Sequence, residues 1–198
     1  MNIDNWLAFV LAYTVISLIP GPSVLMVVSQ ALTHGKKAAF TCIVGDLLGG
    51  VVIILLSLLG LGAVLATSAL AFGLLKWLGV GYLAYLGIQQ IRGASGEVSK
   101  VASKSFRSGF LVGLLNPKAI IFYMVFLAQF IDQSRSVSAQ IAILIPTATV
   151  VVAGVLGGYA LLAARASAAL QRSDFKRKKG YASGGLLLSG SAMLAARG

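Results

Sequence analysis

The tripeptide Pro20-Gly21-Pro22 stands inside an apolar stretch, residues 5–32, that contains no charged residue. A stretch of this length can cross a bilayer, whose hydrocarbon core takes roughly 20 helical residues. Proline removes a helix hydrogen bond and clashes with the preceding turn, and glycine loosens the backbone. We therefore predict a helix that is broken at membrane depth. Because lipid cannot satisfy the freed backbone groups, the break must be buried in protein or line a wet cavity.

Composition places the whole chain in the membrane. Of its 198 residues, 58% are hydrophobic and 11% are charged, whereas soluble domains carry about 25% charged residues. We predict an all-α protein, because strands of a membrane barrel would alternate polar and apolar residues. It forms one transmembrane domain, 1–198, with a first half at 1–92, a basic cytoplasmic loop at 93–107 and a second half at 108–198. The six predicted membrane runs are 6–32, 38–65, 70–91, 106–131, 138–164 and 181–196.

The loop charges predict an orientation. Basic residues gather in the loops after the first, third and fifth runs, and the other two loops carry no net charge. The positive-inside rule then places the basic loops in the cytoplasm and both termini outside. The formal charge of +11 is thus explained by attraction to anionic lipid, and we expect no nucleic-acid partner.

The two halves of the chain share one feature. Pro117 interrupts the fourth run much as Pro20 interrupts the first. Two halves of three helices each are necessarily inverted relative to one another, and many transporters bind substrate between such halves at broken helices. We predict an inverted 3+3 repeat. Glycine pairs four residues apart predict close helix packing; they are Gly45 and Gly49, Gly109 and Gly113, Gly154 and Gly158, and Gly180 and Gly184.

Two charged residues at membrane depth are the main candidates for function. A charge at the bilayer centre costs about 2.5–3.5 kcal/mol on insertion scales. Asp46 could accept a proton, bind a cation or pair with a lysine, and Lys118 is a natural counter-ion for Asp46 or for a substrate carboxylate. Lys76, beside Trp77, is explained by its side chain reaching toward the interface.

The breaks themselves offer complementary chemistry. The free N–H groups of a helix that restarts after Pro22 favour an anion such as a carboxylate. An ammonium is drawn to exposed carbonyls and to Asp46, so the site suits a small zwitterion. Thr147 and Thr149 add uncharged hydrogen-bonding groups. The predicted substrate-binding residues are Pro20, Gly21, Pro22, Ser23, Asp46, Asn116, Pro117, Lys118 and Gln129.

Five short motifs in order resemble the LysE/RhtB amino-acid exporters, the lysine-exporter and homoserine/threonine-exporter type. They are Pro20-Gly21-Pro22, Gly45-Asp46, Lys76-Trp77-Leu78-Gly79 with Tyr82-Leu83-Ala84-Tyr85-Leu86-Gly87, Asn116-Pro117-Lys118-Ala119, and Gln129-Phe130. The resemblance covers about residues 3–132. It implies a six-helix efflux carrier of the bacterial inner membrane that exports amino acids with the proton-motive force and without ATP. Asp46 tilts the implied substrates toward leucine, threonine or homoserine rather than lysine.

These expectations combine into one mechanistic hypothesis. The substrate carboxylate meets the backbone after Pro22 and Lys118, and its ammonium meets carbonyls at the breaks and Asp46. A proton taken up by Asp46 releases the ammonium, and the halves rock to give alternating access. We expect no enzyme activity, no cofactor and no metal, and a homo-oligomer is left open.

Other classes of membrane protein are compatible with the same residues. A passive channel would need the same polar line without proton coupling. A cation exporter is a further alternative, although one carboxylate is too few for a good divalent site. A membrane enzyme has little support, because no carboxylate pair or Ser-His arrangement lies in the predicted runs.

Overall fold

The structure, a computed structural model, describes residues 1–58, 69–93, 101–123, 127–132, 134–169 and 175–196. This part of the chain is helical throughout and contains no strand. The elements are α1 (Ile3–Leu18), α2 (Pro22–Leu58), α4 (Ala69–Gly93), α5 (Val101–Leu114), α6 (Pro117–Ile121), the 3-10 turn η2 (Leu127–Phe130), α7 (Val137–Ala169) and α8 (Phe175–Ala196). Two helical segments, Pro22–Ser57 and Val137–Ser167, are each long and apolar enough to cross a membrane, and Ile3–Leu18 and Tyr181–Ala196 are shorter apolar helices.

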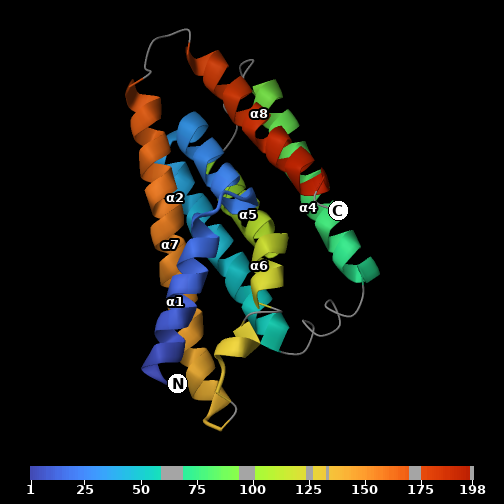
Figure 1. The fold of residues 1–198 in the computed structure, drawn as a ribbon. Helices are drawn as coiled ribbons and strands as arrows, with labels where there is room; N and C mark the ends of the chain where they lie inside the picture. The colour runs from blue at the N-terminus through green and yellow to red at the C-terminus, as the bar shows by residue number, and fades with distance from the viewer. Residues whose placement is uncertain (59–68, 94–100, 124–126, 133, 170–174, 197–198) are drawn as a thin grey trace.

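α2 contains a sharp turn that joins two predicted runs. Gly35 has φ +82° and ψ −177°, a backbone conformation that residues with a side chain rarely adopt. The segment before Gly35 therefore doubles back onto the segment after it, as the blue and cyan parts of the ribbon show (Figure 1). This hairpin places Ser23 and Asp46, which are far apart in sequence, beside the same cavity.

The helices pack around α2. It contacts α5, α7 and α8, while α1 packs on α7 and α4 packs on α8 (Figure 1). One core cluster joins α2 to α4, α5, α7 and α8 and includes Val27, Cys42 and Leu156. A second cluster, with Phe9, Phe122 and Leu144, fills the space nearer the start of α1. The cavity described below lies between these two clusters and is lined by residues of both.

The closest helix contact joins α2 and α5 through glycines. A Cβ atom on Gly109 would lie 2.0 Å from the Cys42 carbonyl oxygen, and one on Gly45 would lie 2.2 Å from the Phe106 carbonyl oxygen. Gly49 and Gly113 are equally crowded, so the prediction of close packing is confirmed for these two pairs. Gly184 packs against the Gly87 backbone.

The packing prediction is wrong for one glycine pair. A Cβ on Gly154 or Gly158 would meet nothing within 4 Å. Both residues lie on a face of α7 that no other described helix covers at these positions. Their spacing arises from the small-residue composition of α7, which also contains Gly157.

Several predicted boundaries shift. α5 begins at Val101, so the predicted loop 93–107 is partly helical. α7 continues to Ala169 and α8 begins at Phe175, so the loop between them is shorter than predicted. α2 ends at Leu58, and the remainder of the run predicted over 38–65 lies outside the described residues.

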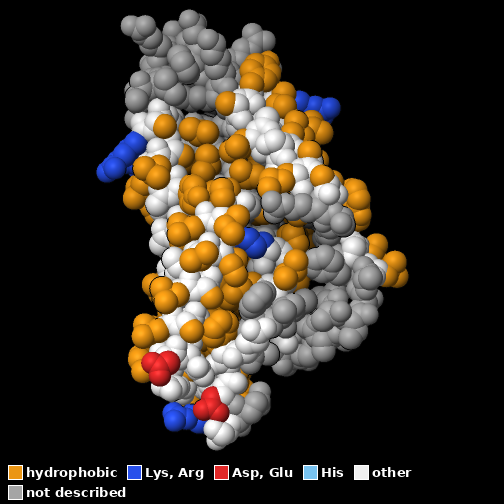
Figure 2. All heavy atoms as spheres, viewed as in Figure 1, with side chains coloured by type: hydrophobic (Ala, Val, Ile, Leu, Met, Phe, Trp, Pro, Cys, Tyr) orange, Lys and Arg blue, Asp and Glu red, His pale blue; other side chains and the backbone are white. Residues whose placement is uncertain are grey.

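Hydrophobic side chains cover most of the described middle of the molecule. Figure 2 shows them in a broad band, with acidic side chains at the end where α1 begins. The most exposed large side chains include Leu11 at 67%, Leu70 at 76% and Val150 at 72%. Such exposure on three different helices fits a molecule surrounded by lipid rather than water.

Candidate functional site

The first predicted break is confirmed. α1 ends at Leu18 and Ile19 is extended, with φ −66° and ψ 122°, before α2 begins at Pro22. Three carbonyl oxygens around the end of α1 accept hydrogen bonds from side chains. Lys118 Nζ donates to the carbonyl oxygens of Ile16 at 3.1 Å and Ile19 at 2.8 Å, and the Tyr159 hydroxyl donates to that of Leu18 at 2.9 Å. A lysine ammonium here also complements the negative end of the α1 dipole.

The second break lies against the first. Asn116 is extended, and its side-chain Oδ1 accepts from the Lys118 backbone N–H at 3.1 Å, which caps α6. Its Nδ2 donates to Ser23 Oγ at 2.9 Å, across the gap between the two breaks. The two breaks, which the predicted inverted repeat pairs with one another, are joined by a direct hydrogen bond.

Asp46 is the most unusual polar residue of the site. It is 6% exposed and lies on α2 opposite Ser23, whose hydroxyl is within hydrogen-bonding reach of its carboxyl group. Its Oδ1 atom is buried and has no hydrogen-bond partner among the described residues. A buried oxygen without a partner costs about 1–3 kcal/mol, and more when it is charged. The arrangement therefore leaves an acceptor that a ligand or a proton would satisfy.

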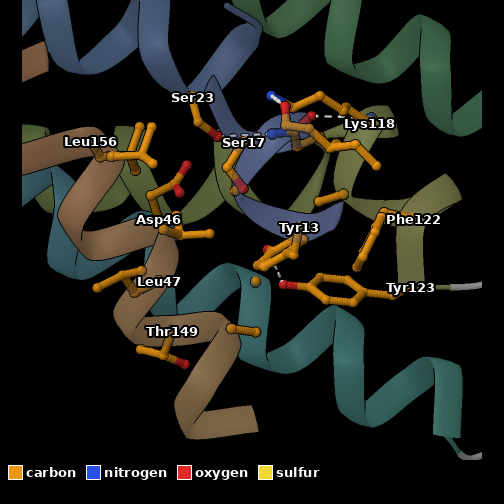
Figure 3. Close-up of a pocket in the computed structure, with 18 of the residues that line it drawn as sticks. Tyr13, Ser17, Ser23, Asp46, Leu47, Lys118, Phe122, Tyr123, Thr149 and Leu156 are labelled. Carbon is orange, nitrogen blue, oxygen red and sulfur yellow. Dashed lines mark hydrogen bonds between the residues drawn. The ribbon is translucent and has the colours of Figure 1, made fainter. Parts of the chain in front are cut away.

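These groups line one cavity of about 60 Å³. This volume has room for a few water molecules. Figure 3 shows Asp46, Ser17 and Ser23 on one side and the Tyr13 and Tyr123 rings on the other. Leu47, Val51, Val152 and Leu156 form an apolar wall. The cavity thus combines an acid, an amine, hydroxyls and an apolar surface in a small volume.

Asp46 and Lys118 share this cavity without pairing. The ion pair between described side chains joins Arg135 Nε and Asp132 Oδ2 at 3.3 Å, far from the site, and Asp46 and Lys118 do not form one. The Lys118 ammonium bonds the α1 carbonyls instead. Asp46 therefore keeps its free oxygen atom.

Some of the other predicted site residues lie at the cavity or the breaks, and others do not. Gly21 lies against the Lys118 side chain, and Pro20, Pro22 and Pro117 shape the breaks without lining the cavity. Thr149 lines the cavity. Gln129 lies in η2, is exposed and is not a lining residue. The side chain of Lys76 lies outside the described residues.

Sequence reasoning missed three tyrosines. Tyr13 and Tyr123 line the cavity and their hydroxyls hydrogen-bond one another, and Tyr159 bonds the first break. In the sequence they sit in apolar runs, where a tyrosine is an ordinary core residue. One available signal was position, because Tyr13 precedes Pro20 and Tyr123 follows Pro117 by similar short intervals.

Comparison with known proteins identifies the family. The family model described as LysE type translocator matches residues 14–197. The chain belongs to the LysE type translocator family. Among its relatives, an uncharacterized membrane protein of Vibrio cholerae is 38% identical over 83% of each chain. The membrane location of this LysE-type translocator therefore agrees with that of its relatives.

Two relatives carry names that describe transport. The homoserine/homoserine lactone efflux protein of Salmonella typhimurium is 35% identical over 98% of each chain. The leucine efflux protein of Klebsiella pneumoniae is 31% identical over 65% of this chain and 64% of its own. No solved structure matches this LysE-type translocator. Among the described residues, no group of three or more His, Cys, Asp or Glu side chains could hold a metal ion.

Proposed function

We propose that this LysE-type translocator exports small neutral amino acids from the cytoplasm. The observation that carries the proposal is Asp46 Oδ1, a buried carboxylate oxygen without a partner in a cavity between two helix breaks. The names of the homoserine and leucine efflux relatives support the same substrate class.

The cavity offers a partner for each group of a zwitterion. The ammonium of the substrate binds Asp46, since Lys118 and Tyr159 already bond three carbonyls at the first break. The carboxylate binds at the start of α2, where a helix leaves its first N–H groups without intrahelical partners and carries the positive dipole end. Ser23 and Val24 of this first turn line the cavity, and Lys118 adds a positive charge nearby. The apolar wall accommodates an uncharged side chain.

The proposal includes the membrane arrangement that the sequence predicts. Six spans would consist of α1 with the first part of α2, the second part of α2, α4, α5 with α6 and η2, α7, and α8. The meeting of the two breaks through Asn116 and Ser23 supports an inverted repeat, because such transporters bind substrate where broken helices of the two halves meet. In the bacterial inner membrane, protonation of Asp46 from outside would couple export to the proton-motive force.

Purified protein in proteoliposomes tests the proposal. Vesicles are loaded with homoserine, threonine, leucine or lysine, and efflux is followed with and without an imposed pH gradient. We expect efflux of the neutral amino acids against their own gradient when a proton gradient drives it. Asp46→Asn keeps the shape of the side chain but cannot carry the proton, so it should abolish the pH dependence and most of the rate.

Asp132→Asn is the matched control, because Asp132 is a carboxylate outside the cavity that pairs with Arg135. It should transport like the parent. If Asp46→Asn retained both the rate and its pH dependence, the coupling proposal would be wrong. Downhill flux alone, with no uphill transport under any gradient, would indicate a passive channel.

A further inference from the structure

The cavity is closed toward the start of α1 by a cluster of four aromatic rings. Phe9 and Tyr13 come from α1, and Phe122 and Tyr123 follow α6. All four side chains are at most 5% exposed. The ring of Tyr13 lies 5.5 Å from that of Phe9, 4.5 Å from Phe122 and 5.7 Å from Tyr123 between centroids. Tyr13 is therefore the centre of this aromatic plug, defined here as Phe9, Tyr13, Phe122 and Tyr123.

Beyond the plug lies a second, narrower space. It is lined by Phe9, Tyr123, Leu127, Leu144 and their neighbours, and it has no room for a water molecule. Tyr123, Ile54 and Ala148 line both spaces, so they form the partition between them. Any solute that leaves the main cavity in this direction must separate the rings first.

The plug is held by one polar contact. The hydroxyls of Tyr13 and Tyr123 hydrogen-bond one another, and Figure 3 shows them meeting at the edge of the cavity. No other hydrogen bond to either hydroxyl occurs among the described residues. Buried hydroxyls need partners, so separating the rings requires that each hydroxyl find another partner, which a passing hydrated solute can provide.

The two tyrosines lie on segments next to the two breaks. Tyr13 lies on α1, which ends before the break at Ile19, and Tyr123 lies just past α6, which begins after the break at Asn116. The breaks interrupt the backbone hydrogen bonds that would stiffen a continuous helix. A rotation of either segment about its break would therefore change the distance between the two hydroxyls.

We propose that the Tyr13–Tyr123 pair is the gate through which substrate leaves the main cavity toward the α1 N-terminal face. The direction of travel rests on the proposed export function, but the gate itself does not. Opening breaks the hydroxyl pair and joins the main cavity to the second space, and closing restores the pair.

The labelling rate of a cysteine in the cavity measures opening of the gate and does not require transport activity. In a Cys42→Ala background, Ser17→Cys places a thiol among the cavity residues, and its reaction rate with a membrane-impermeant methanethiosulfonate reagent is measured from each face in intact cells and in inverted vesicles. Asn2→Cys marks the α1 N-terminal face and Lys37→Cys marks the opposite face. Tyr13→Phe leaves the Tyr123 hydroxyl unpaired, and Tyr123→Phe does the reverse. Each should speed labelling from the Asn2 face roughly tenfold, the factor expected when one buried hydroxyl loses its partner.

Three comparisons make the test specific. Tyr85→Phe removes a hydroxyl from α4, outside the cavity, and should label like the parent. The double variant Tyr13→Phe/Tyr123→Phe leaves no unpaired hydroxyl, so it should label more slowly than either single variant. A double variant that labels at the product of the two single effects, or single variants that label faster from both faces, would overturn the gate.

The two proposals can fail separately. Faster labelling from the Asn2 face without amino-acid export would keep the gate and reject the proposed substrate. Normal export with unchanged labelling in both single variants would keep the function and reject the gate. The unchanged reactivity of Asn2→Cys in each variant shows that the protein is inserted with the same face accessible.

Discussion

At the scale of one residue, Lys118 stabilises the first break as well as lining the cavity. Its ammonium bonds the carbonyl oxygens of Ile16 and Ile19. Hydrogen bonds to a charged group contribute about 1.5–3 kcal/mol, and partial exposure of Lys118 reduces that figure. We expect Lys118→Met to lower the free energy of unfolding by about 1–2 kcal/mol, measured by denaturant titration in detergent micelles.

Lys37→Met is the matched control for this change. Lys37 is exposed just after Gly35, and no hydrogen bond of its ammonium to a helix end is among the described contacts. Its substitution should change stability by less than about 0.5 kcal/mol, as for most surface changes. Equal losses in both variants would show that the carbonyl contacts of Lys118 contribute nothing.

A second residue-scale prediction concerns the hydrogen bond between the breaks. Asn116→Ala removes both the cap of α6 and the bond to Ser23 Oγ, whereas Ser23→Ala removes that bond and the hydroxyl beside Asp46 but leaves the cap. Each loss should cost about 1–2 kcal/mol. In a double-mutant cycle the two effects should be less than additive by about 1 kcal/mol, and strict additivity would mean that the breaks are not coupled.

At the scale of elements, the α2–α5 contact depends on its glycines. Gly109→Ala would place a Cβ 2.0 Å from the Cys42 carbonyl oxygen, and because that atom belongs to the backbone the helices must separate. We expect a loss of about 3 kcal/mol or more, in the range of severe overpacking. It should appear as a loss of monodisperse protein in detergent and a lower melting temperature.

Gly154→Ala makes the same substitution at an uncrowded position and should have the opposite effect on stability. Nothing lies within 4 Å of the added atom on α7, and alanine favours the helix over glycine by about 0.5–1 kcal/mol. Its melting temperature should therefore stay equal or rise slightly. A destabilised Gly154→Ala variant would show that another surface packs on this face of α7.

The same glycines show what the sequence could and could not predict. Spacing alone identified Gly45, Gly49, Gly109 and Gly113 correctly. It could not show that Gly154 and Gly158 contact no helix in the described part of the chain, because packing partners depend on tertiary structure. Both breaks were predictable, since proline acts locally. The contact of Asn116 with Ser23 and the bonding of Lys118 to α1 carbonyls were not, because they require the hairpin at Gly35.

The aromatic plug illustrates the same limit. Phe9 and Tyr13 are four residues apart and share one face of α1, which the sequence displays. Their partners, Phe122 and Tyr123, become neighbours only when the second break turns the chain beside α1. Long-range aromatic contacts of this kind follow from the fold and leave no local pattern.

At the scale of the whole molecule, the distribution of charge predicts how the protein sits in the membrane. Asp4 lies in the first turn of α1 and Asp132 lies near the N-terminal amine, whereas Lys36 and Lys37 directly follow the Gly35 turn. Figure 2 shows acidic side chains at the end where α1 begins and apolar side chains over most of the described middle. Basic residues in short loops stay in the cytoplasm. We therefore expect Lys37→Cys to react with an impermeant thiol reagent only from the cytoplasmic face, in a Cys42→Ala background.

Asn2→Cys should react only from the outer face, measured in intact cells against inverted vesicles. In this orientation the aromatic plug lies between the main cavity and the outside, so an exported solute must pass it. The opposite labelling pattern would reverse the sense of the route, and the Tyr13–Tyr123 pair would then control entry from the cytoplasm rather than exit. Measuring the two cysteines therefore tests the loop-charge argument and decides the direction in which the gate faces.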